Sequence, residues 1–164
     1  MKIIKITVAS IVAIVLVAGI FLFKGELAPK EVDAKYTSDT SQFFTMRNGA
    51  RIHFRDEGNP NGPAVVLVHG SNASLHTWEP WVAILGESYR IITMDLPAHG
   101  LTGAVPDQRY GSPAQLRTVD AVVRHLGLDK FTPGGNSMGG GVTWRYTLAH
   151  PEKVEAMLLI DTSG

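Results

Sequence analysis

The residues of this 164-residue chain best suited to chemistry are Gly135-Asn136-Ser137-Met138-Gly139. They fit the G-x-S-x-G pattern, in which a serine sits on a strained turn between a strand and a helix. Such a turn brings the residues two before and two after the serine against neighbouring backbone, where only glycine leaves room. Residues 140–149 read as a helix whose first N–H groups would favour negative charge beside the serine. The pattern predicts a nucleophilic hydroxyl at Ser137.

The segments around this motif alternate between strand and helix patterns. A continuous apolar run at 64–68 suits a strand that is covered on both faces. Further strands are predicted at 90–95 and 154–161, and helices at 78–85, 112–126 and 140–149. An antiparallel hairpin is predicted before them, over 43–47 and 51–55, around an Asn-Gly turn. The alternation predicts an α/β fold with a mostly parallel sheet and helices on both faces.

Three polar motifs follow predicted strands directly: His69-Gly70, Asp95-Leu96-Pro97 and Ser137. Ligands of such sheets bind beyond the carboxyl ends of the strands, so these motifs are expected to lie near one another. The strand predicted before Ser137 contains Pro133, which cannot donate a ladder hydrogen bond.

Four motifs in this order resemble the α/β-hydrolase superfamily over residues 42–164. They are His69-Gly70, the DLPAHG segment at 95–100, the motif at 135–139, and AHPEKV at 149–154. The resemblance is to membrane-anchored esterase-like or lipase-like members, and the GNSMGG elbow also resembles that of carbon–carbon bond hydrolases acting on ring-cleavage products. Dehalogenases and epoxide hydrolases place an aspartate where this chain has serine.

Two residues depart from the family pattern. Ala98 stands where a glycine is usual, which is expected to tighten its loop slightly. Pro133 stands among residues that are normally apolar, and it is expected to weaken the sheet near the serine.

The resemblance implies acyl-transfer chemistry on an ester-like small molecule, without metal or cofactor. Ser137 would attack a carbonyl, and the backbone N–H groups of Met138 and Ser71, with Asn72 as neighbour, would hold the oxyanion. His69 and Gly70 would shape the loop that carries Ser71.

The remaining triad members are expected to be missing. In this superfamily the order along the chain is serine, acid, histidine. The one histidine after Ser137 is His150, about 18 Å along the predicted helix and out of reach. His76 and His99 could border a pocket, and Asp161 reads as a loop residue. The chain is therefore expected to be the amino-terminal part of a hydrolase, truncated after the strand that follows the nucleophile helix, and inactive alone.

A different kind of sequence precedes this domain. Residues 6–23 carry no charge and as a helix would measure about 27 Å, close to the thickness of a bilayer core. They predict a signal anchor within 1–24, followed by a linker at 25–41. Lys2 and Lys5 would keep the amino terminus cytoplasmic and the hydrolase part extracytoplasmic. Secretion after signal cleavage is the alternative.

Composition excludes some functions. The formal net charge is zero, which disfavours a nucleic-acid partner, and the chain has no cysteine for disulfides or thiolate metal sites. A membrane-tethered binding module that kept the fold without the chemistry is the alternative from another class. Substrate preference and oligomeric state stay open.

Overall fold

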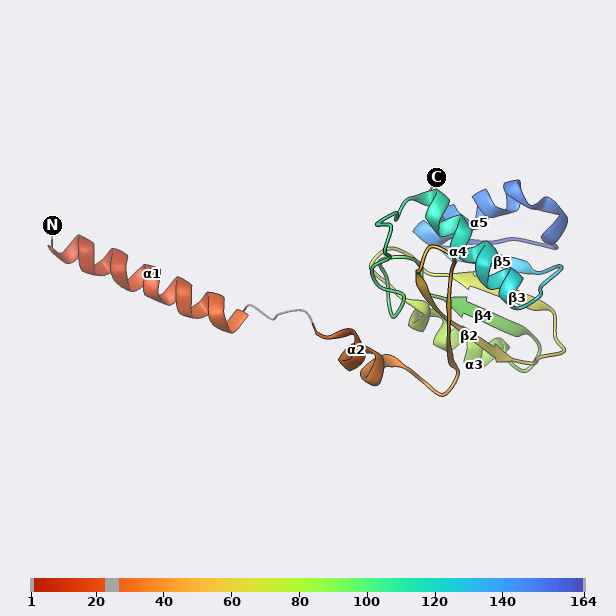
Figure 1. Cartoon of the computed structure of the whole chain (residues 1–164), viewed down its shortest axis with the longest axis horizontal. Coiled ribbons are helices and arrows are strands. Elements are labelled where there is room, and N and C mark those ends of the chain that lie inside the picture. The colour runs from red at the N-terminus through yellow and green to blue at the C-terminus, as the bar shows by residue number, and fades with distance from the viewer. Residues whose placement is uncertain (1, 23–26, 164) are drawn as a thin grey trace. The chain divides into compact units, whose positions relative to one another are not determined.

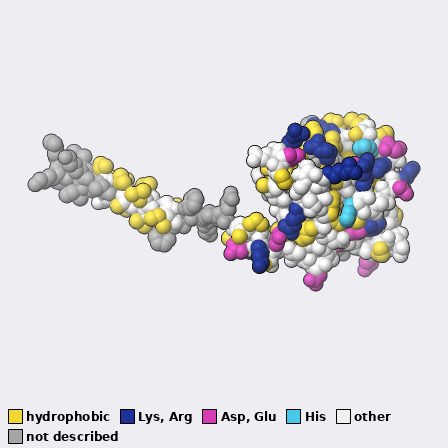
Figure 2. All heavy atoms as spheres, viewed as in Figure 1, with side chains coloured by type: hydrophobic (Ala, Val, Ile, Leu, Met, Phe, Trp, Pro, Cys, Tyr) yellow, Lys and Arg dark blue, Asp and Glu magenta, His cyan; other side chains and the backbone are white. Residues whose placement is uncertain are grey.

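The computed structural model describes residues 2–22 and 27–163 (Figure 1). The chain divides into two compact units, Met1–Lys35 and Tyr36–Gly164. The first unit holds helix α1 (Lys2–Leu22) and all but the last residue of α2 (Pro29–Tyr36). The described side chains of α1 are mostly apolar and exposed (Figure 2).

The predicted membrane span at 6–23 is not supported. A helix is present there, but no helix in the described part of the chain has both the length and the apolarity that crossing a bilayer requires. The last residue of that range, Phe23, lies outside the described residues.

The predicted linker contains a short helix, α2, which was not predicted because its sequence has no periodic apolar pattern. Pro29 is its first residue, where proline has the helical φ and the missing N–H is harmless. The Glu31 carboxylate accepts a hydrogen bond of 3.2 Å from the Ala28 N–H, as in a capping box. Since α2 buries no residue, local hydrogen bonding specifies it rather than packing.

The second unit is built on a six-stranded sheet with the strand order β1-β2-β4-β3-β5-β6. Strands β3, β4, β5 and β6 are parallel, whereas β1 pairs with β2, and β2 with β4, in antiparallel fashion. The mostly parallel sheet is therefore confirmed. The bounds are β1 Ser41–Thr45, β2 Arg51–Gly58, β3 Ala64–Val68, β4 Arg90–Met94, β5 Thr132–Asn136 and β6 Leu158–Ile160.

The predicted hairpin is β1 and β2. Phe43 pairs with His53 and Thr45 with Arg51, and the turn between the strands carries Gly49 at φ +82°. Gly49 has this positive φ but Asn48 does not, so the turn is not the two-residue type I′ turn, in which both central residues have positive φ.

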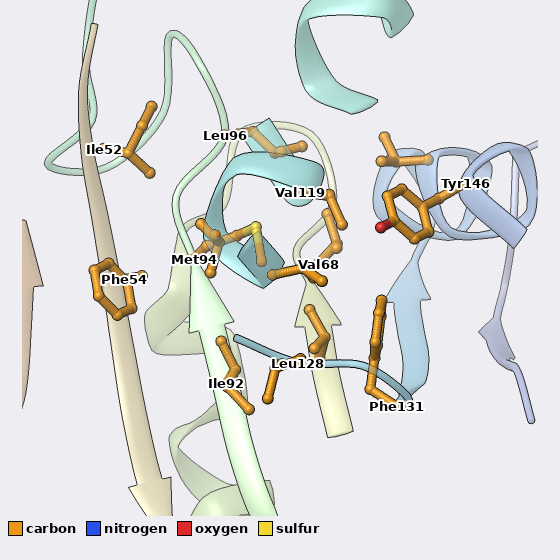
Figure 3. Close-up of a cluster of buried hydrophobic side chains, with 14 of the residues drawn as sticks. Ile52, Phe54, Val68, Ile92, Met94, Leu96, Val119, Leu128, Phe131 and Tyr146 are labelled. Carbon is orange, nitrogen blue, oxygen red and sulfur yellow. The ribbon is translucent and has the colours of Figure 1, made fainter. Parts of the chain in front are cut away.

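Helices cover both faces of the sheet, as predicted. The short η1 (Leu75–Trp78) and α3 (Glu79–Leu85) pack on one face, against Val65, Leu67 and Ile91. The helices α4 (Ser112–His125) and α5 (Met138–Ala149) contribute to the main core cluster on the other face. Figure 3 shows this cluster, with strand residues such as Phe54, Ile92 and Met94, Val119 from α4 and Tyr146 from α5. The 3-10 turn η2 (Pro151–Lys153) follows α5.

Strand β6 is much shorter than the predicted 154–161, and Pro133 explains where it is interrupted. Val154 forms only an isolated bridge with Phe131, and regular pairing with β5 starts at Gly134 and Leu158. The backbone N–H and C=O groups of successive strand residues point to opposite sides of the strand. Those of Phe131 bond the 153–155 segment, so the backbone groups of Pro133, two residues on, point to the same side. The missing proline N–H thus falls in the gap between the bridge and β6.

Candidate active site

Ser137 lies between the end of β5 and the start of α5, at φ 51° and ψ −116°. This combination is outside the regions that residues with a Cβ normally occupy. A Cβ on Gly135 would lie 2.3 Å from the carbonyl carbon of Gly139, and a Cβ on Gly139 would lie 2.1 Å from the carbonyl oxygen of Val68. No Cβ fits at such distances, so both glycines are required for this turn.

The loop after β3 packs directly against this turn. A Cβ on Gly70 would lie 3.4 Å from Ser137 Cβ and 2.8 Å from Asn136 Oδ1. One residue further on, the Ser71 hydroxyl donates to Met138 Sδ at 3.5 Å. The structure therefore brings Gly70, Ser71, Ser137 and Met138 together, although 67 positions separate the two residues of the Ser71–Met138 pair.

Two segments contribute backbone N–H groups to this region. Met138 is the first residue of α5, and the N–H groups of a first helical turn have no partner inside the helix. Ser71 is exposed, and Asn72 after it turns the loop at φ 54°. An anion beside the Ser137 hydroxyl would face the positive end of α5.

His69 holds this loop in place. Its ring is buried, its Nδ1–H donates to the Gly70 carbonyl at 2.7 Å, and its Nε2 accepts from the Leu96 N–H at 3.1 Å. This pattern requires the neutral ring. Burial lowers the pKa of His69 below its ordinary value of 6.5 and outweighs the opposing effects of the Gly70 hydrogen bond and the Asp95 charge. A ring with both nitrogens engaged positions the loop and is not free to take a proton.

Asp95, directly after β4, connects the segment after β3, at Leu75, with the segment after β4, at Leu101. Its Oδ1 accepts from the Leu75 N–H and its Oδ2 from the Leu101 N–H, both at 2.8 Å, and His53 Nδ1–H donates to Oδ2 at 2.7 Å. Burial acts to raise the pKa of Asp95, but these hydrogen bonds exceed that effect and hold the pKa below 3.8. The ionised carboxylate is fully satisfied and serves structure.

His53 was predicted only as a hairpin residue, and its role as a partner of Asp95 was missed. Its Nε2 lies 2.8 Å from Ser41 Oγ, so Ser41, His53 and Asp95 form a hydrogen-bonded chain. The ring is fully buried and stacks on Phe43 with 4.8 Å between ring centres. No substrate reaches it. Only the pairing of β1, β2 and β4 brings these three residues together, so no local sequence pattern could have revealed these hydrogen bonds.

The remaining histidines also have structural partners. His76 bonds Glu79, His99 bonds the Pro97 carbonyl, His125 stacks on Phe44, and His150 is the C-cap of α5. Within residues 2–22 and 27–163 no histidine forms a hydrogen bond with the Ser137 hydroxyl.

Asp161 lies in the loop after β6, as expected, at φ 44°. Two positions on, the Ser163 N–H donates to the Ser137 carbonyl at 3.1 Å. No group of three or more possible metal ligands occurs in the described part of the chain.

Comparisons with known proteins agree with this geometry. The family described as alpha/beta hydrolase fold matches residues 63–164. A 2-hydroxy-6-oxo-6-phenylhexa-2,4-dienoate hydrolase of Burkholderia cepacia is 30% identical over 135 residues, which cover 77% of this chain and 46% of the relative. The esterase RhEst1 from Rhodococcus is 31% identical with a TM-score of 0.67, covering 75% of this chain and 46% of the esterase. A membrane phospholipase A is 25% identical with a TM-score of 0.71, covering all of this chain and 53% of the phospholipase.

The chain spans about a third to a half of the length of curated relatives that it matches. The family match nevertheless covers more than half of this chain, including the loop after β3 and the strained serine turn. The chain belongs to the α/β-hydrolase fold family.

Proposed function

We propose that this chain supplies the nucleophile and the oxyanion-binding groups of a serine hydrolase that acts on an ester or related acyl bond. The observation that carries this proposal is the contact between the strained turn at Ser137 and the loop at Gly70-Ser71. The likeness to an esterase and to a phospholipase supports an ester as the substrate.

In the proposed reaction, the Ser137 oxygen attacks the carbonyl carbon and the carbonyl oxygen becomes an oxyanion. The N–H groups of Met138 and Ser71, with Asn72 beside them, would donate to that oxygen. One such donor is typically worth about 3 kcal/mol of barrier. Because these donors belong to a helix start and a packed loop, they need no rearrangement when the charge develops.

The proton of the Ser137 hydroxyl needs a base, since a lone serine is a poor nucleophile. No described histidine contacts that hydroxyl, and Asp95 is occupied by its own partners. The base and the acid that orients it are therefore proposed to come from outside the described residues, in chain sequence that follows or in a second chain.

Turnover of a chromogenic ester tests this proposal. Two proteins are compared, each with its Ser137→Ala variant. One is the product of the whole reading frame that contains this chain, and the other is residues 1–164 alone. We expect turnover by the longer protein, its loss in Ser137→Ala, and none by residues 1–164. Turnover that survives Ser137→Ala would disprove the nucleophile. Serine-dependent turnover by residues 1–164 would disprove the external base.

Carbon–carbon bond hydrolysis is the second candidate, because the Burkholderia relative is named for a hydroxy-oxo-dienoate substrate. The two are separated by assaying the same longer protein with a vinylogous diketo acid and with a simple ester. Binding of a substrate analogue without turnover of either compound would instead favour a binding module.

We also propose that the amino-terminal unit attaches the protein to a membrane, with the second unit extracytoplasmic. The exposed apolar side chains of α1, such as Ile14, Leu16 and Ile20, support attachment. So does the likeness over the whole chain to a membrane phospholipase A. Fractionation of cells expressing the chain with and without residues 1–24 tests attachment. Protease accessibility in intact cells tests the side.

A further inference from the structure

We propose that Met138 is an oxidation site, at which hydrogen peroxide converts the thioether to a sulfoxide inside the candidate active site. The modification itself follows from the surroundings of the sulfur. Its effect on Ser137 rests on the proposed function.

Two hydrogen-bond donors from distant segments meet at this sulfur. The Ser71 hydroxyl lies 3.5 Å from Met138 Sδ, and Gln115 Nε2 lies 3.4 Å from it. Gln115 stands on α4, whose N-cap Gly111 has no side-chain cap, and the Gln115 amide reaches across to Met138 on α5.

The other methionines whose side chains the structure describes lack these donors. Met94 is fully buried in the main core cluster, and Met46, like Met138, is partly buried and packs against that cluster. Met157 is 39% exposed near the start of β6. Met138 is partly buried, and its sulfur lies 3.5 Å from the hydroxyl of Ser71, which is an exposed residue.

The chemical step is balanced between the thioether and the peroxide. A sulfur lone pair attacks one peroxide oxygen, the O–O bond breaks, an S–O bond forms, and the second oxygen leaves as water after proton transfer. Sulfur is oxidised and peroxide is reduced. The Ser71 hydroxyl and the Gln115 amide, already directed at the sulfur, would then donate to the new oxygen. That oxygen accepts hydrogen bonds more strongly than a thioether does.

The added oxygen changes the site next to the nucleophile. It brings partial negative charge close to Ser137 and the Met138 N–H, where the proposed oxyanion would form. It would also accept a hydrogen bond from the hydroxyl of Ser71, whose backbone N–H is the other proposed donor. Oxidation at Met138 is therefore expected to oppose charge development in the transition state.

Peptide mapping by mass spectrometry of the full chain treated with hydrogen peroxide tests the site. Sulfoxide is expected to accumulate at Met138 about tenfold faster than at Met94, because susceptibility follows exposure. Methionine sulfoxide reductases are expected to reverse it. Oxidation of Met138 no faster than of Met94 would overturn the proposal, and this readout requires no enzymatic activity.

The effect on Ser137 is tested with the longer protein. Peroxide-treated wild type and Met138→Leu are each compared with their own untreated activity. The ester turnover of wild type is expected to fall about tenfold or more and that of Met138→Leu to be retained, since leucine has no sulfur to oxidise. Equal losses in both proteins would refute an effect through Met138. Absence of ester turnover from the untreated longer protein would count against the proposed function alone, because the peptide map still decides the oxidation site.

Discussion

Replacing Ser137 by glycine is expected to stabilise the protein, although glycine normally does the opposite. Ser137 stands at φ 51° and ψ −116°. Holding a residue with a Cβ in so sparsely populated a region costs about 1–3 kcal/mol. Glycine removes that strain but adds about 0.4–1 kcal/mol of conformational entropy to the unfolded chain. The balance is a gain of roughly 1 kcal/mol in the free energy of unfolding, or about 4 °C in Tm for a unit of this size.

Thermal and urea denaturation followed by circular dichroism measures this change. Ser137→Ala is the first control: it keeps the Cβ and its strain, so it should unfold within about 0.5 kcal/mol of wild type. Ser74→Gly is the second. Ser74 stands at φ −146° and ψ 179° and makes no side-chain cap. Its replacement should lower the free energy of unfolding by roughly 0.5–1 kcal/mol.

The comparison has a clear negative outcome. If Ser137→Gly unfolds at or below the temperature of Ser137→Ala, the turn stores no strain that a Cβ creates. The strain assigned to Ser137 from its φ and ψ would then lose its support.

Three further changes test other parts of the same site. Ala98 replaces an expected glycine and stands at φ 68°, so Ala98→Gly should raise the free energy of unfolding by about 0.5–1 kcal/mol in urea titrations. Gly139→Ala places a Cβ 2.1 Å from a backbone oxygen and should lower that free energy by about 3 kcal/mol or prevent folding. Its control, Gly111→Ala, meets nothing closer than 3.8 Å and should cost about 1 kcal/mol or less. The pKa of His69 is lowered from 6.5 in the folded protein, so the unfolded chain binds the proton first as pH falls. Stability should therefore be constant above that value and decline below it, and His69→Gln should decline less between pH 7 and 5. Parallel slopes in wild type and His69→Gln would contradict the assignment of a neutral ring.

Much of the fold was predictable because the signals that specify it are local. The apolar run 64–68 matches β3 residue for residue, and the Asn-Gly pair predicted the presence of the first hairpin. The spacing of Gly135, Ser137 and Gly139 predicted the turn between β5 and α5, although the backbone that requires a glycine at 139 belongs to Val68 on β3.

Other features needed the folded chain. The contact of Gln115 with the sulfur of Met138 and the shortness of β6 depend on segments far apart in sequence. The sequence showed that Ala98 stands where a glycine is usual, but it did not show the φ of 68° at this residue. The loop holds this backbone conformation through a hydrogen bond from the Ala98 N–H to the Gly103 carbonyl.

The sequence by itself determined where a reactive serine would stand and which backbone turn would present it. Only the tertiary structure decided what surrounds it: Ser71 and Gln115 at the sulfur of Met138, and His53 on Asp95 beneath the neighbouring loops. A turn is set by the φ and ψ preferences of adjacent residues. The partners of a side chain depend on which strands pair and which helices pack, and those are properties of the whole sheet.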